Sequence, residues 1–155
     1  NTPPSQMVER VESLFKDKKE LEKRLKSRTK NENVDSHILD KIEIVGDYEM
    51  LVVKVQVSSM EDLKVLGDNV FNKLQNGVAV IFSKGEEKPM AVVVVSKNLN
   101  EKGIIAGKIS KTVGGFMGGG GGGKPHLATA GGKDNSTINE AMNLTKKLIN
   151  DTLSR

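Results

Sequence analysis

The chain has 155 residues, a length that fits one domain with an appendage and allows a real hydrophobic core. It contains no cysteine, which excludes disulfide frameworks and thiolate metal sites and suits a reducing compartment. The formal net charge is +4 at pH 7, and the segment from Lys97 to Lys133 alone has six lysines and one acid. Such clustering is typical of a surface that binds a polyanion, with ordinary solvated lysines as the alternative.

The apolar segments are too short to cross a membrane. The longest runs, Val78–Phe82 and Met90–Val95, fall far below the ~20 residues that a membrane-spanning helix needs. No secretion signal opens the chain, which starts at Asn1 rather than at Met. We therefore expect a cytoplasmic piece of a longer protein, with no membrane partner.

The first predicted element is a helix from about Ser5 to Lys30. Its apolar residues recur at alternating spacings of four and three, a heptad pattern that Lys18 and Arg28 interrupt. The residues expected to carry oligomerisation are Met7, Val11, Leu14, Leu21 and Leu25. So narrow a stripe needs a partner helix, in a second copy or elsewhere in a longer chain, although docking on its own domain is the alternative. A polar linker follows, so we predict a helical coiled-coil arm over residues 1–36 and a globular domain over residues 37–155.

The globular part alternates between strand and helix patterns. Strands are predicted at residues 41–45, 48–57, 78–82 and 90–95, the first two joined by a Gly46-Asp47 turn. Helices are predicted from Ser58 or Ser59 as N-cap to a stop at Gly77, over residues 103–113, and after an N-cap at Asn135 or Ser136. This order predicts an α/β fold, a layered domain with a small mixed sheet flanked by helices and preceded by a long N-terminal coiled-coil helix.

The stretch FMGGGGGGKPHLATAGGKD, residues 116–134, joins the last two predicted helices. Gly118, Gly123 and Lys124 have the spacing of a nucleotide-binding loop, but Pro125 stands where that loop needs a hydroxyl for magnesium. ATP hydrolysis is therefore not expected. Ordering six successive glycines costs much backbone entropy, which is tolerable where backbone closely approaches backbone or ligand. We expect an ordered, glycine-lined surface, with tight packing without a ligand as the alternative.

The same stretch resembles the glycine-rich signature near the end of alanyl-tRNA synthetases. The matching residues are Gly118–Gly123, Lys124, Pro125, His126, Leu127, Ala128, Gly131 and Gly132. The flanking segments GIIAGKISKTVGG and TINEAMNLTKKLI resemble the helices of that family's C-terminal domain, called C-Ala, which is of the DHHA1 type. The heptad arm is similar to the coiled-coil segment before it. Lys124 stands where arginine is common, which keeps the charge but loses the planar fork.

The resemblance implies a tRNA-binding module without chemistry of its own. In that family the domain binds the outer corner of tRNA and helps to coordinate aminoacylation with editing. It implies alanine-specific tRNA as partner, a homodimer through the N-terminal helix, and a parent class II alanine–tRNA ligase that uses ATP with Mg and an editing-domain Zn. Two alternatives are the substrate-binding DHHA1 half of a DHH-type phosphoesterase and a plain oligomerisation module.

No catalytic or metal-binding residues stand out, and no cofactor is expected in this chain. His37, placed at a strand edge, and His126 are isolated and cannot build a zinc site. With no Trp, one Tyr and four Phe, a stacking platform for single strands is not expected, which leaves phosphate and shape contacts to a folded RNA. The predicted RNA-binding residues are Lys108, Lys111, Gly119, Gly120, Gly121, Gly122, Gly123, Lys124, His126 and Lys133. For His126, a hydrogen bond to the backbone of the glycine run is the alternative.

Overall fold

The computed structural model describes residues 10–19 and 37–154, and the chain divides into two units, Asn1–Val34 and Asp35–Arg155. In the first unit, residues 10–19 are helical and both Val11 and Leu14 are exposed. Met7, Leu21, Leu25 and the expected linker lie outside the described residues. The long coiled-coil helix therefore stays a prediction.

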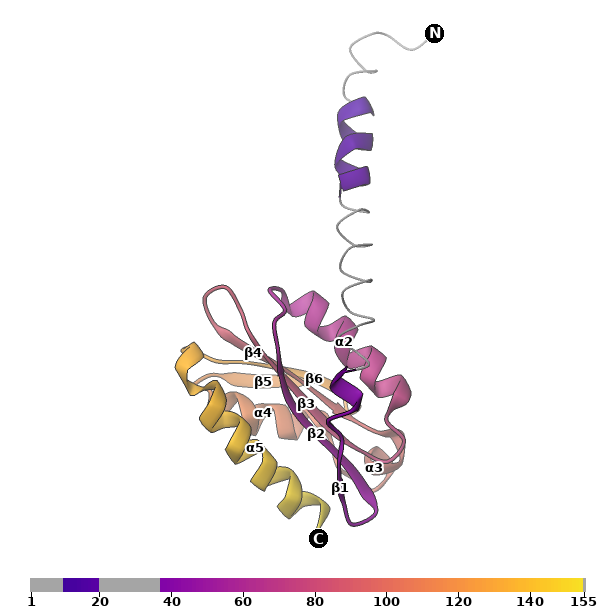
Figure 1. Cartoon of the computed structure of the whole chain (residues 1–155), viewed down its shortest axis with the longest axis vertical. Coiled ribbons are helices and arrows are strands. Elements are labelled where there is room, and N and C mark those ends of the chain that lie inside the picture. Colours follow the sequence, from indigo (N-terminus) through magenta and orange to yellow (C-terminus); the bar gives the residue numbers. More distant parts are fainter. Residues whose placement is uncertain (1–9, 20–36, 155) are drawn as a thin grey trace. The chain divides into compact units, whose positions relative to one another are not determined.

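The second unit is built on a six-stranded mixed sheet with the order β1-β2-β3-β4-β6-β5 (Figure 1). The strands are β1 (Glu43–Val45), β2 (Tyr48–Val55), β3 (Gly77–Lys84), β4 (Pro89–Val95), β5 (Gly120–Gly123) and β6 (Leu127–Gly131). β2 and β3 are parallel, and all other neighbours are antiparallel. Gly46, at φ +64°, and Asp47 form the predicted two-residue turn between β1 and β2. The predicted mixed α/β architecture is confirmed.

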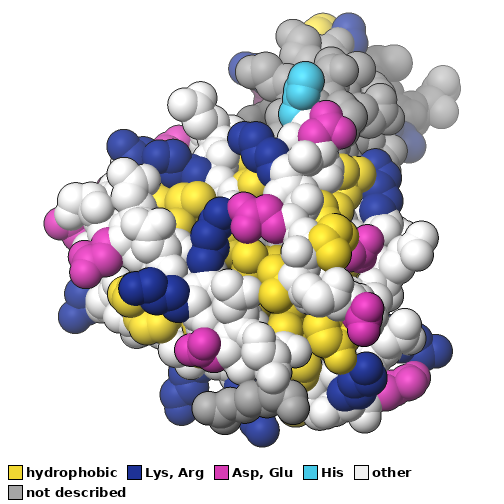
Figure 2. Space-filling model, turned by 60° about the horizontal axis from the view of Figure 1, so that its bottom comes forward, with side chains coloured by type: hydrophobic (Ala, Val, Ile, Leu, Met, Phe, Trp, Pro, Cys, Tyr) yellow, Lys and Arg dark blue, Asp and Glu magenta, His cyan; other side chains and the backbone are white. Residues whose placement is uncertain are grey.

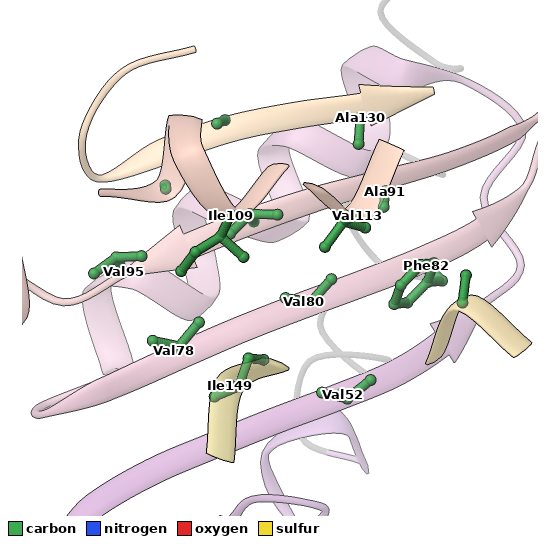
Figure 3. Packing of buried hydrophobic residues seen from close by; sticks show 14 of the residues in the cluster. Val52, Val78, Val80, Phe82, Ala91, Val95, Ile109, Val113, Ala130 and Ile149 are labelled. Atoms are coloured by element: carbon green, nitrogen blue, oxygen red, sulfur yellow. The ribbon is translucent and has the colours of Figure 1, made fainter. Parts of the chain in front are cut away.

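Helices cover both faces of this sheet. They are α2 (Met60–Lys73), α3 (Lys97–Glu101), α4 (Ala106–Phe116), the 3₁₀ turn η1 (Asn135–Thr137) and α5 (Ile138–Leu153). α2 lies on one face, where a Cβ on its Gly67 would contact the Val92 side chain. α4 and α5 pack on the opposite face, as Ile109, Val113 and Ile149 show in Figure 3. The result is a three-layer arrangement with the sheet in the middle.

The core lies mainly between the sheet and the α4–α5 layer. Buried strand residues on this side include Val52, Val78, Val80, Phe82, Ala91 and Val95 (Figure 3). The two central strands β3 and β4 are buried on both faces, which explains why their sequences read as continuous apolar runs. Burial of each large aliphatic or aromatic side chain stabilises the fold by about 1.5–3 kcal/mol.

Three details differ from the sequence expectations. Gly77 does not end α2: Leu74 is the C-cap, and Gly77 opens β3, where a Cβ would overlap the backbone of Glu49. Neither Asn135 nor Ser136 is an N-cap: Asp134 caps the turn η1, where its Oδ1 accepts the Ser136 N–H at 2.8 Å, and Thr137 is the N-cap of α5. Residues 37–39 form a helical turn with His37 exposed, so this residue does not lie at a strand edge.

Candidate functional site

The glycine run is an edge strand, in a stretch where the sequence predicted no strand. β5 pairs with β6 in a hairpin, with Gly120 opposite Gly131 and Gly122 opposite Thr129. The turn closes through the Lys124 N–H, which donates to the Leu127 carbonyl at 2.9 Å. All four glycines of β5 are exposed, and β5 is the last strand of the sheet. The run is thus hydrogen-bonded to a neighbouring strand along one edge only.

The two faces of β5 have different surroundings. On the face toward α4, a Cβ added to Gly121 would overlap the Ser110 carbonyl, and one added to Gly114 of α4 would overlap Gly120. On the other face, a Cβ at Gly120 or Gly122 would have nothing within 4 Å. Because strand residues alternate between faces, a single run packs backbone against backbone on one side and is bare on the other. The run is therefore closely packed on one face and forms an exposed, glycine-lined surface on the other.

The edge of β5 also directs backbone donors away from the sheet. In an antiparallel pair, residues alternate between bonding the partner strand and pointing their N–H and C=O groups outward. The Lys124–Leu127 bond sets this alternation, so Gly122 bonds β6 while Gly121 and Gly123 point away from it. The strand therefore directs two backbone N–H groups away from β6, at the edge of the sheet, next to an exposed lysine.

The turn Lys124-Pro125-His126 is held in place by main-chain hydrogen bonds. The Pro125 carbonyl accepts the Ala106 N–H at 2.7 Å and so caps the start of α4. The His126 carbonyl accepts the Val95 N–H at 2.9 Å from the end of β4. Substitution of the exposed Lys124 or the partly buried His126 leaves these bonds intact because they come from the backbone.

A depression of about 340 Å³ lies between the bare face of the hairpin and α2. Its lining residues are Lys64 and Asp68 of α2 with Gly122, Gly123, Lys124, His126, Leu127, Ala128 and Thr129 of the hairpin. Lys64 and Lys124 come from different elements and bring two ammonium groups to one hollow, against one carboxylate. This combination of cations and exposed backbone suits an anionic group such as a phosphate.

The remaining predicted residues lie elsewhere on the domain. Lys108 lines a separate depression between α4 and α5, and Lys111 is exposed on α4. Lys133 lies two residues beyond the end of β6, at the end of the hairpin away from the turn. The structure therefore brings Gly122, Gly123, Lys124 and His126 together, while these three lysines stand apart.

Lys64 and Asp68 were absent from the sequence-based site. Both are exposed residues on the outer side of α2, where a charged residue is the ordinary choice. Their proximity to the hairpin depends on how α2 lies across the sheet, so no local pattern could have indicated it. His126 was predicted, but its contact with Phe71 of α2, with the ring centroids 5.3 Å apart, likewise depends on where α2 lies.

Three further properties of the described residues do not indicate a particular ligand: the arrangement of possible metal ligands, the character of the helices and the charges on one face. Among residues 10–19 and 37–154, no group of three or more His, Cys, Asp or Glu residues is arranged to hold a metal ion. None of the helices in that same part of the chain has the length and apolar character required to cross a bilayer. On the face drawn in Figure 2, basic and acidic side chains alternate around exposed apolar groups. That face has no field of a single sign.

Comparison with known proteins agrees with the fold. The model of the DHHA1 domain family matches residues 47–151. The chain is 36% identical over 99% of its length to an alanine–tRNA ligase of Alkaliphilus metalliredigens, and 34% identical over 96% to one of Bacillus thuringiensis. It spans only 18% and 17% of these relatives.

A solved structure covers the same region. The C-Ala domain of Aquifex aeolicus alanyl-tRNA synthetase is 32% identical, with a TM-score of 0.63 over 71% of this chain and 98% of that one. The match spans nearly the whole of a separately folded domain, so it concerns an entire module rather than a shared motif. This chain therefore belongs to the DHHA1 domain family, as a C-terminal domain of the alanyl-tRNA synthetase type.

Proposed function

We propose that this chain is the tRNA-binding C-terminal module of an alanine–tRNA ligase, located in the cytoplasm. It binds the outer corner of alanine-specific tRNA through phosphate and shape contacts and helps to bring the aminoacylation and editing sites onto one tRNA. The module itself is non-catalytic. ATP, Mg and the editing Zn belong to other domains of the parent enzyme.

The observation that carries this proposal is the bare outer face of β5 beside two lysines. A ribose–phosphate backbone is bulky and can lie against a protein backbone only where side chains are missing. Gly120 and Gly122 provide such a surface, and Lys64 and Lys124 lie next to it. Lysines and backbone N–H groups bind phosphates without reading sequence, as recognition of a folded RNA requires.

The salt dependence of tRNA binding tests the proposal. Each lysine that contacts a phosphate releases counterions, so Lys124→Ala or Lys64→Ala should weaken binding and reduce the slope of log K against log salt by about one. Lys147→Ala, an exposed lysine on α5, is the matched control and should leave both quantities unchanged. If neither Lys124→Ala nor Lys64→Ala alters affinity or slope, this surface does not bind RNA.

The N-terminal helix supports a second part of the proposal, a homodimer. Val11, Leu14 and Phe15 are 50%, 63% and 68% exposed, a costly arrangement for large apolar side chains in water. Phe15 lies outside the heptad positions that the sequence suggested. Pairing with the same helix of a second copy would bury all three residues.

The two alternatives raised by the sequence have less support. The relatives reported above are alanine–tRNA ligases rather than phosphoesterases. A plain oligomerisation module has no use for the bare glycine face, which lies in the second unit of the chain. That reading also predicts no tRNA complex at near-physiological salt, so the binding experiment separates it from ours.

A further inference from the structure

His126 separates two hollows on the surface formed by α2 and the hairpin turn. One is the lysine-lined depression described above, and His126 is among its lining residues. The second has a volume of about 280 Å³ and is lined by Phe71, Lys97, Asn100, Pro125 and His126. That volume is near the lower end of the ~300–1,000 Å³ range of small-ligand pockets, which suits a single planar ring system rather than a whole nucleotide.

The ring pair in this second hollow is open to solvent. The centroids of Phe71 and His126 are 5.3 Å apart, with a tilt of 48° between the rings. Both residues are only partly buried, and Pro125 beside them is exposed. A buried phenylalanine would be explained by core packing alone, but here part of the ring surface stays in contact with water. The pair therefore places aromatic ring surface where a ligand can reach it.

Hydrogen bonds hold parts of the wall of this hollow in place, which reduces the entropy lost when a ligand is held there. The Asn100 side-chain Nδ2 donates to the Val95 and Ser96 carbonyls at 3.0 and 3.1 Å. The turn that carries His126 is fixed by the bonds to Val95 and Ala106. Lys97 also lines the hollow and adds a cation to it.

We propose that Phe71 and His126 form a stacking site for one exposed base of the RNA that lies along β5. This inference rests on the proposed function and adds a contact that phosphate recognition does not include. Base faces stack on aromatic rings whatever their sequence, so the site would accept a base at a loop or at the end of a base-paired stack. Because His126 borders both hollows, a phosphate between Lys64 and Lys124 and a stacked base on the ring pair would lie side by side. From the sequence a stacking platform for single strands was not expected, because the sequence does not show that α2 brings Phe71 to the hairpin.

Substitution of Phe71 tests the stacking site directly. Phe71→Leu keeps an apolar side chain but removes the ring, and we expect tRNA binding to weaken roughly 5- to 100-fold, the range for loss of one stacked base. The salt slope should not change, because no phosphate contact is lost. Phe71→Tyr should restore near-normal affinity, and His126→Ala should weaken binding in the same direction. Phe116→Leu, at another partly buried phenylalanine, is the control.

A fluorescent base gives a second readout. A five-nucleotide RNA with 2-aminopurine at its centre is titrated with the chain, and binding is followed separately by anisotropy. We expect the fluorescence of the bound oligonucleotide to be quenched by the unmodified chain and by Phe71→Tyr, but not by Phe71→Leu. Equal quenching by all three proteins, or none at saturating protein, would overturn the inference.

The two proposals fail in different ways. If Lys124→Ala weakens tRNA binding with a reduced salt slope while Phe71→Leu binds tRNA as well as the unmodified chain, the ring pair only packs α2 against the hairpin. In that case the RNA-binding function stands and the stacking site is wrong. If neither lysine variant affects binding, the function fails, and the stacking site fails with it.

Discussion

Two neighbouring glycines of β5 should respond in opposite ways to the same substitution. Gly121 faces α4, where a Cβ would overlap the Ser110 carbonyl, whereas a Cβ on Gly122 would meet nothing within 4 Å. Neither glycine has a positive φ, so alanine fits the backbone conformation at both positions. We therefore predict that Gly121→Ala damages the fold and that Gly122→Ala damages only binding.

The expected magnitudes follow from these surroundings. The atom that blocks Gly121 is a main-chain carbonyl inside a helix, which cannot swing aside as a side chain can. Overpacking of this kind destabilises the fold by about 1–3 kcal/mol. Alanine also lowers the conformational entropy of the unfolded chain, which stabilises the fold by only ~0.4–1 kcal/mol. Gly122→Ala gains that same ~0.4–1 kcal/mol without an opposing clash. For a domain of this size, the net loss of up to ~2.6 kcal/mol for Gly121→Ala lowers Tm by up to several degrees.

Thermal unfolding and tRNA binding, measured on both variants, test the pair. We expect a lower Tm for Gly121→Ala and an unchanged or higher Tm for Gly122→Ala. The Gly122→Ala variant should bind tRNA more weakly, because its new methyl group projects into the hollow between Lys64 and Lys124. Normal tRNA affinity in a stably folded Gly122→Ala protein would refute the idea that the bare face receives the RNA backbone.

Three further outcomes are expected. Asp68→Asn removes the carboxylate from the lysine-lined hollow, so tRNA should bind about 2- to 5-fold more tightly at low salt in a filter-binding assay; unchanged or weaker binding would speak against a phosphate there. The backbone N–H of Ser136 lowers the pKa of Asp134, so the stabilisation from this charge is present above the ordinary value of 3.8 and is lost as pH falls through the lowered pKa. The Tm difference between the unmodified chain and Asp134→Ala should accordingly shrink on acidification, and a constant difference would contradict this linkage. Leu14→Asp should shift the chain toward monomer in sedimentation equilibrium, whereas Lys16→Asp on the same exposed helix should not, and equal effects would argue against an apolar dimer seam.

Local sequence patterns were sufficient for most of the secondary structure. The apolar runs that became β3 and β4, the Gly46-Asp47 turn and the Ser59 cap each depend on neighbouring residues, so the sequence alone could indicate them. The hairpin β5–β6 could not be read in this way, because glycine has no side chain and hence no alternating pattern. Only pairing with β6 and the close approach of α4 determine that the run is a strand.

The site was predictable only where its residues are close in sequence. Gly122, Gly123, Lys124 and His126 lie in one short segment, and their likeness to a family signature drew attention to them together. Lys64 and Phe71 are far away along the chain and reach the hairpin only because α2 crosses the sheet. Charge clustering in sequence does not imply clustering in space, since Lys108 belongs to the basic segment yet lies on the α4–α5 side.

Because residues alternate between the two faces of β5, the fold requires glycine at some positions of this strand and only tolerates it at others. Packing against α4 explains glycine at 121, where no other residue fits, but it gives no reason for glycine at 120 or 122. At those two positions alanine would lower the entropy of the unfolded chain and would meet no clash, so glycine costs stability there. A residue that weakens the fold without a structural reason is best explained by contact with something outside the chain. The open glycines, rather than the tightly packed one, are therefore the positions that point to a bound partner backbone.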